Sequence, residues 1–175
     1  FVIVGAWTFS GFILWFTLLF TEKEQILHQK WPYLLLFGIP VASILSQWVD
    51  GNVITYVQRS FGWGIAWQKT FLARALVIHI FMTIVLSIAL MLHFSVKSGN
   101  PIKKKQARII GMSLFAGFFF GYGTNIIVPA FTEISFPDIV HNMALVWAIG
   151  LVYAMVKYNF LAISPAMAAE NIIST

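Results

Sequence analysis

The sequence contains no cysteine and few charged residues. Of its 175 residues, 11 are Lys or Arg and 6 are Asp or Glu. The absence of cysteine excludes disulfide bonds, iron–sulfur clusters, thiolate zinc sites and cysteine nucleophiles. A charged fraction of 10% is too low for an ordinary soluble domain, in which about a quarter of the residues are charged. These deficits argue against a disordered chain, a nucleic-acid-binding module and a cytosolic enzyme.

What is present instead is a series of long apolar intervals. Hydrophobic residues make up 59% of the chain, and five charge-free intervals approach the roughly 20 residues that a helix needs to cross a bilayer. The sequence therefore predicts an all-α membrane protein, a bundle of five transmembrane helices followed by a cytoplasmic C-terminal helix. The predicted spans are about residues 1–21, 31–49, 70–96, 108–131 and 139–157; together they form a transmembrane domain over 1–157, and residues 158–175 form a cytoplasmic signalling-helix segment.

The basic residues are distributed unequally between the two sides of this predicted bundle. Cytoplasmic loops of membrane proteins carry an excess of Lys and Arg, so the side with more cations is expected to be cytoplasmic. Residue 1 then lies outside and the C-terminus inside. Eight cations lie on the inner side (Lys23, Lys30, Lys97, Lys103, Lys104, Lys105, Arg108 and Lys157) and three on the outer side (Arg59, Lys69 and Arg74).

Two features inside the apolar intervals bear on helix packing. Pro40 has no backbone N–H, so it is expected to kink its helix and free a carbonyl for a neighbouring helix or water. Ser113, Gly117 and Gly121 recur every four residues and predict a smooth stripe where another helix approaches closely. Packing within the bundle and contact with a second copy both remain open for this stripe.

Polar and aromatic residues gather at the predicted outer rim. Ionisable groups at a membrane edge need partners or water, and the rim therefore predicts a pocket for a small molecule, open to the outside. The alternative is a solvated rim of ordinary topology charges and aromatic side chains. The candidate ligand-binding residues are Asp50, Arg74 and Glu133 as polar contacts, Trp63 and Trp67 as an apolar lid, and Asn125 at the floor.

Two histidines near the predicted outer end of the bundle suggest a different function for that end, the binding of a haem. His79 and His141 are expected at similar depth on the third and fifth predicted spans, where they could ligate one haem between them. Helix packing with a satisfied ring nitrogen is the simpler alternative for each. No metal site, no catalytic residue and no resident cofactor is predicted apart from this haem alternative.

Three stretches resemble a known family. They are LFTEKEQILHQKWPYLLLFGIPVASIL (19–45), KKKQARIIGMSLFAGFFFGYGTNIIVP (103–129) and LVYAMVKYNFLAISPAMAAENIIS (151–174). They are similar to the N-terminal seven-transmembrane sensor region of bacterial sensor histidine kinases and some diguanylate cyclases. The resemblance implies that the five intervals match spans three to seven, with two further spans before residue 1.

The resemblance also implies a function. The chain would be a sensory domain of the bacterial inner membrane that relays a small-molecule signal to a cytoplasmic kinase or cyclase output. Its expected partners are the lipid bilayer, a second copy of itself, and a PAS or kinase domain on the same full-length chain, but not nucleic acid. No ATP-binding glycine motif is present, so this segment is not expected to be an enzyme. A haem-binding electron-transfer subunit and a scaffold subunit of a larger membrane complex remain the alternatives.

Overall fold

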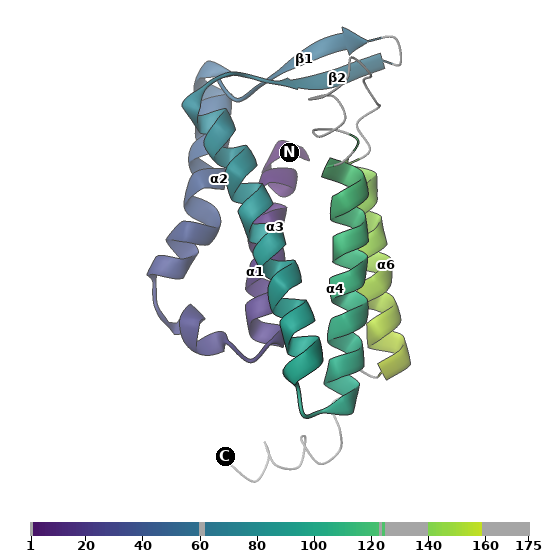
Figure 1. The fold of residues 1–175 in the computed structure, drawn as a ribbon. Coiled ribbons are helices and arrows are strands. Elements are labelled where there is room, and N and C mark those ends of the chain that lie inside the picture. The colour runs from purple at the N-terminus through teal and green to yellow at the C-terminus, as the bar shows by residue number, and fades with distance from the viewer. Residues whose placement is uncertain (1, 60–61, 123, 125–139, 159–175) are drawn as a thin grey trace.

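The computed structural model describes residues 2–59, 62–122, 124 and 140–158. In Figure 1 a two-stranded hairpin crosses one end of a set of long helices, and α2 lies to one side of α1 and α3. The elements in chain order are α1 (Val2–Phe20), the short 3-10 helix η1 (Glu24–His28), α2 (Trp31–Asp50), β1 (Ile54–Arg59), β2 (Gly62–Trp67), α3 (Phe71–Lys97), α4 (Pro101–Tyr122) and α6 (Val140–Tyr158).

The core lies where α1, α3, α4 and α6 meet. Ile13 of α1, Ile84 of α3 and Leu114 of α4 belong to one buried cluster. Met91 and Ile110, neither of them exposed, belong to another, nearer the α3–α4 turn. The helices are therefore joined along their lengths by apolar contacts, which are worth about 25 cal/mol per Å² of buried apolar surface.

The small-residue stripe of α4 packs inside this bundle. Gly117 and Gly121 are buried, and the side chain of Ser113 leaves no room for a Cβ on Gly150 of α6. Close approach of two helices needs small side chains at the crossing. At Ser113, therefore, this stripe lies against α6.

The hairpin is antiparallel, with its register running from the pair Ile54–Trp67 to the pair Arg59–Gly62. Because directly opposite residues share a face, one face carries small or polar residues and the other carries most of the apolar ones. Arg59 lies over Gly64 on the small face, where a Cβ would come within 3.1 Å of its Nε. The apolar face consists of Ile54, Tyr56, Gln58, Trp63, Ile65 and Trp67.

The prediction of an all-α bundle with five transmembrane helices is wrong. Within the described residues, only α2 and α3 are long and apolar enough to cross a membrane, and α1 and α6 are apolar over the shorter stretches Val4–Phe20 and Ala144–Tyr158. The beginning of α4 holds Lys103, Lys104, Lys105 and Arg108, which shorten its apolar part. The connection between α2 and α3 is a β-hairpin, because its β-branched and aromatic residues favour paired strands.

Candidate functional site

Gln47, near the end of α2, ties the base of the hairpin to that helix. Its Oε1 accepts hydrogen bonds from the backbone N–H groups of Val53 and Ile54, each at 2.9 Å, and its Nε2 donates to the carbonyl of Ile54 at 3.2 Å. Val53 is 0% exposed and Ile54 is 3% exposed. A single side chain thus satisfies three backbone groups that have little access to water.

The connection from β2 to α3 is tied to the connection from α2 to β1 in a similar way. Gln68 Nε2 donates to the carbonyl of Gly51 at 2.6 Å, and Thr70 Oγ1 donates to the carbonyl of Asn52 at 2.7 Å. Thr70 is also the N-cap of α3, where its Oγ1 accepts from the N–H of Ala73. Gly51 ends α2 at φ +63°, a left-handed conformation that glycine adopts without a Cβ penalty. These contacts fix the hairpin to both helices.

The apolar face of the hairpin packs on the end of the bundle at its base and is open further along. Trp67 stacks on Trp7 of α1 with ring centroids 6.4 Å apart, and Ile54 lies in a buried cluster with Trp7. Farther along the same face, Tyr56 is 60% exposed and Trp63 is 73% exposed. Large exposed aromatic side chains are typical of a membrane interface or a binding surface.

Arg74 borders a hollow between α2 and α3. The hollow has a volume of about 440 Å³ and apolar walls, formed by Ile39 of α2 and by Phe71, Ala75 and Ile78 of α3, with His79 also lining it. Arg74 is exposed. It belongs to the first turn of α3, beside this hollow.

His79 supplies the hydrogen bond that Pro40 cannot. Because Pro40 has no N–H, the carbonyl of Leu36, four residues earlier, has no helical donor. His79 is 8% exposed, and its Nε2 lies 3.2 Å from that carbonyl oxygen. Gly11 of α1 meets the same oxygen, which a Cβ would approach to 2.7 Å. The expected freed carbonyl is therefore present, and its partner is a histidine ring that must carry its proton on Nε2.

This contact bears on the haem alternative. Ligation through Nε2 of His79 would break the bond to Leu36, so a haem would have to use Nδ1 or displace α2. His141 lies in α6, but its side chain is outside the described residues. Among the residues that the structure describes, no group of three His, Cys, Asp or Glu side chains could hold a metal ion.

The predicted ligand-binding residues are only partly brought together. Asp50 is the last residue of α2 and is exposed. Trp63 and Trp67 share the apolar face of the hairpin, and Arg74 is an exposed residue of the first turn of α3. Asn125 and Glu133 lie outside the described residues, as does the predicted signalling-helix segment beyond residue 158.

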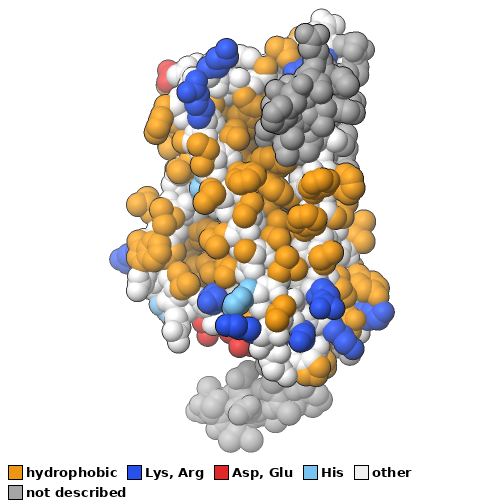
Figure 2. Space-filling model, in the orientation of Figure 1, with side chains coloured by type: hydrophobic (Ala, Val, Ile, Leu, Met, Phe, Trp, Pro, Cys, Tyr) orange, Lys and Arg blue, Asp and Glu red, His pale blue; other side chains and the backbone are white. Residues whose placement is uncertain are grey.

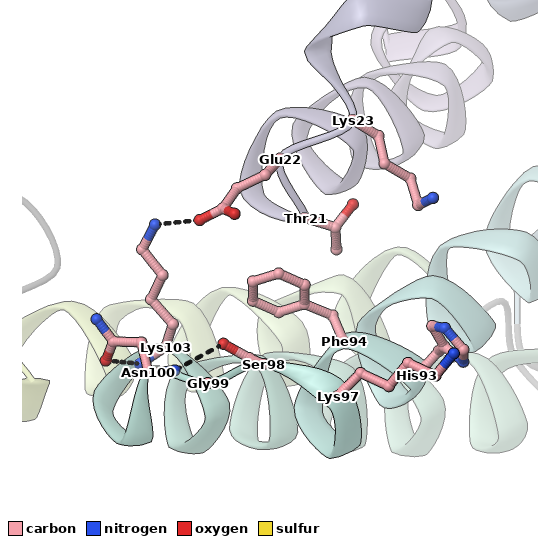
Figure 3. Close-up of a pocket in the computed structure, with 10 residues that line it drawn as sticks. All are labelled: Thr21, Glu22, Lys23, His93, Phe94, Lys97, Ser98, Gly99, Asn100 and Lys103. Carbon is pink, nitrogen blue, oxygen red and sulfur yellow. Dashed lines mark hydrogen bonds and ion pairs between the residues drawn. The ribbon is translucent and has the colours of Figure 1, made fainter.

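A second hollow, at the opposite end of the molecule, was not anticipated from the sequence. This basic pocket has a volume of about 510 Å³ and lies between the end of α1 and the α3–α4 turn (Figure 3). The pattern that could have indicated it is the repeated occurrence of a basic residue just after an apolar helix. Its lining residues are Thr21, Glu22, Lys23, His93, Phe94, Lys97, Ser98, Gly99, Asn100 and Lys103.

No family model matches this chain, and no curated protein or solved structure matches it at a significant level.

Proposed function

We propose that the chain is the membrane-embedded sensory part of a bacterial signalling protein, in which the hairpin lies outside and the α3–α4 turn lies in the cytoplasm. The observation that carries the proposal is the attachment of the hairpin to two potential membrane spans. Through Gln47 and Thr70 the hairpin is bonded at the ends of α2 and α3. A ligand that changes the position of the hairpin would therefore change the relation of these helices.

Membrane placement is supported by the exposed side chains of α2 and α3. Leu34 of α2 is 72% exposed, and Ile78 and Met82 of α3 are 62% and 60% exposed. Soluble monomers rarely expose large continuous apolar surfaces, whereas lipid requires them. Figure 2 shows many apolar side chains along the middle of one face, with Lys and Arg toward its two ends.

Orientation is supported by the charge distribution. Eight of the eleven Lys and Arg residues belong to the side that holds the α3–α4 turn, and three to the side that holds the hairpin. The positive-inside rule assigns the first side to the cytoplasm. In this orientation α2 runs outward to the hairpin and α3 returns inward.

The signalling part of the proposal is supported by the three stretches that resemble the sensor region of histidine kinases and diguanylate cyclases. A ligand acts only through its different affinity for two states of the protein. In this proposal the exposed aromatic face of the hairpin, with Tyr56 and Trp63, takes part in receiving the signal.

Orientation is tested by cysteine labelling, which is simple because the chain has no cysteine of its own. Gln58→Cys lies on the hairpin, and Gly99→Cys lies in the α3–α4 turn, where a Cβ meets nothing within 4 Å. In spheroplasts, a membrane-impermeant maleimide should label Gln58→Cys at once and Gly99→Cys only after permeabilisation. The reverse pattern, or equal labelling, would overturn the orientation.

Signalling is tested with the full-length protein in its native membrane. ATP-dependent autophosphorylation or cyclic dinucleotide synthesis is measured for the wild type, for Gln47→Ala and for the control Thr55→Ala. Gln47→Ala should change the output several-fold. Thr55→Ala should not, because this exposed side chain lies on the opposite face of the hairpin from Tyr56 and Trp63. Absence of both activities would overturn the proposal. So would a Soret band in the purified protein that disappears in His79→Ala.

A further inference from the structure

The basic pocket is built from three segments that are distant in the sequence. Lys23 follows α1, His93 and Lys97 belong to the last turns of α3, and Lys103 belongs to the first turns of α4. The pocket therefore gathers three lysines and one histidine around a single hollow, against one carboxylate, that of Glu22.

The carboxylate is already occupied. Glu22 Oε1 pairs with Lys103 Nζ, the one ion pair among the described residues. In Figure 3 this pair lies on one side of the pocket, and Lys23, His93 and Lys97 lie on the other. Lys23 and Lys97 have no described acidic partner, so the pocket keeps a net positive charge even when the histidine is not counted. Like charges around one hollow repel each other, and an anion between them relieves the repulsion.

Local hydrogen bonds order the backbone at the rim. Glu22 adopts φ +60°, and the N–H of Lys23 donates to the carbonyl of Leu18 at 2.9 Å, which ends α1 and turns the chain toward the pocket. Across the hollow, Asn100 Oδ1 accepts from the N–H groups of Ile102 and Lys103 at 2.9 and 3.2 Å. The basic side chains thus extend from ordered turns, which lowers the cost of gathering them around an anion.

We propose that this pocket binds the phosphate headgroup of an anionic phospholipid of the cytoplasmic leaflet. The proposal rests on the membrane orientation proposed above and not on signalling. Lys97 ends α3, one of the two helices in the described part of the chain that are long and apolar enough to cross a membrane. The pocket therefore lies at the level where this apolar helix would leave the bilayer core. Phe94 lines the pocket, and the neighbouring Val96 is 69% exposed. Lipid chains would lie against such side chains while the phosphate meets the lysines.

A free phosphate ion carries the same kind of charge as a lipid phosphate, but it has no glycerol group or acyl chains to occupy the rest of the pocket and the neighbouring apolar surface. A volume of about 510 Å³ exceeds what one phosphate group fills and leaves room for a glycerol headgroup. Compact ammonium groups such as those of Lys23 and Lys97 suit a phosphate diester as point charges, without the bidentate geometry that arginine offers.

The test uses the purified protein in neutral detergent and three probes: dihexanoyl phosphatidylglycerol, dihexanoyl phosphatidylcholine and inorganic phosphate. Native mass spectrometry measures the apparent affinity of each. The pocket variant Lys23→Gln/Lys97→Gln should lose about tenfold or more in affinity for phosphatidylglycerol. The matched control Lys105→Gln/Arg108→Gln removes the same charge from exposed positions of α4 outside the pocket, and its affinity should change less than twofold.

Each remaining result has one meaning. Equal losses of affinity for phosphatidylglycerol in the two variants would show diffuse attraction to a basic surface and would overturn the proposal that the pocket binds the lipid. Equal affinity for phosphatidylcholine, or displacement of the lipid by equimolar inorganic phosphate, would overturn the assignment to an anionic lipid. Both variants replace exposed lysine or arginine side chains, and equal thermal unfolding of both confirms that they fold. Lipid binding is measured in detergent and does not depend on the output activity. A negative result would therefore overturn the lipid site without bearing on the proposed sensory function, which has separate tests.

Discussion

Removal of the Gln47 side chain should open the hairpin without unfolding the helices. Gln47→Ala leaves two backbone N–H groups, of Val53 and Ile54, and the Ile54 carbonyl without their partner. Each buried polar group left unsatisfied costs about 1–3 kcal/mol, and local relaxation toward water recovers part of it. The expected loss is about 2–4 kcal/mol in the free energy that holds the hairpin closed. Gln47→Glu keeps both accepted bonds and should lose less.

Hydrogen–deuterium exchange of the protein in detergent measures this opening directly. A loss of about 2 kcal/mol corresponds to about thirty-fold faster exchange of protected amides. The increase should be confined to peptides that cover Val53 and Ile54, and peptides of α3 and α4 should keep their protection. Gln58→Ala is the control on the same hairpin. Unchanged exchange in Gln47→Ala, or the same increase in Gln58→Ala, would refute the idea that this glutamine fastens the hairpin.

Two further substitutions test the helix contacts, with thermal unfolding in a fixed detergent as the measurement. His79→Phe should destabilise the protein by about 1–3 kcal/mol because the Leu36 carbonyl loses its hydrogen-bond donor. Adding Pro40→Ala restores a helical N–H to that carbonyl and should recover part of the loss. If the effects of the two substitutions on stability were simply additive, His79 and the residue-40 N–H would not share the Leu36 carbonyl as acceptor. Gly150→Ala should cost about 1–3 kcal/mol through overpacking against Ser113; Ser113→Gly in the same chain should rescue it, and a neutral Gly150→Ala would contradict the close packing.

The sequence located the helical segments more successfully than the connection between them. Absence of charge over some 20 residues marks the regions that become α1, α2, α3 and α6. It cannot distinguish a helix that crosses a bilayer from one that packs on its neighbours, since both bury apolar side chains. The run Ile54-Thr55-Tyr56-Val57 and the glycines at 62 and 64 carry a strand pattern, which the aromatic content of the segment obscured.

The candidate site was less predictable because its organisation depends on contacts between distant residues. Pro40 signals from the sequence that a carbonyl is freed, but only the packing of α3 against α2 identifies His79 as its donor. Gln47 is an ordinary polar residue of an apolar helix until the hairpin folds back onto it. Lys23 and Lys97 meet at one pocket although 74 residues separate them along the chain, and no local pattern contains that information.

The bond between His79 and Leu36 has a mechanical consequence. It holds α2 against α3 at Leu36, and because Pro40 has no N–H, α2 lacks one of its own backbone hydrogen bonds at this point. A helix bends most easily where such a backbone hydrogen bond is absent. A bend of α2 at Pro40 would therefore move its second half relative to its first half. Gln47 lies in that second half, so its hydrogen bonds to Val53 and Ile54 would carry the base of the hairpin along with it.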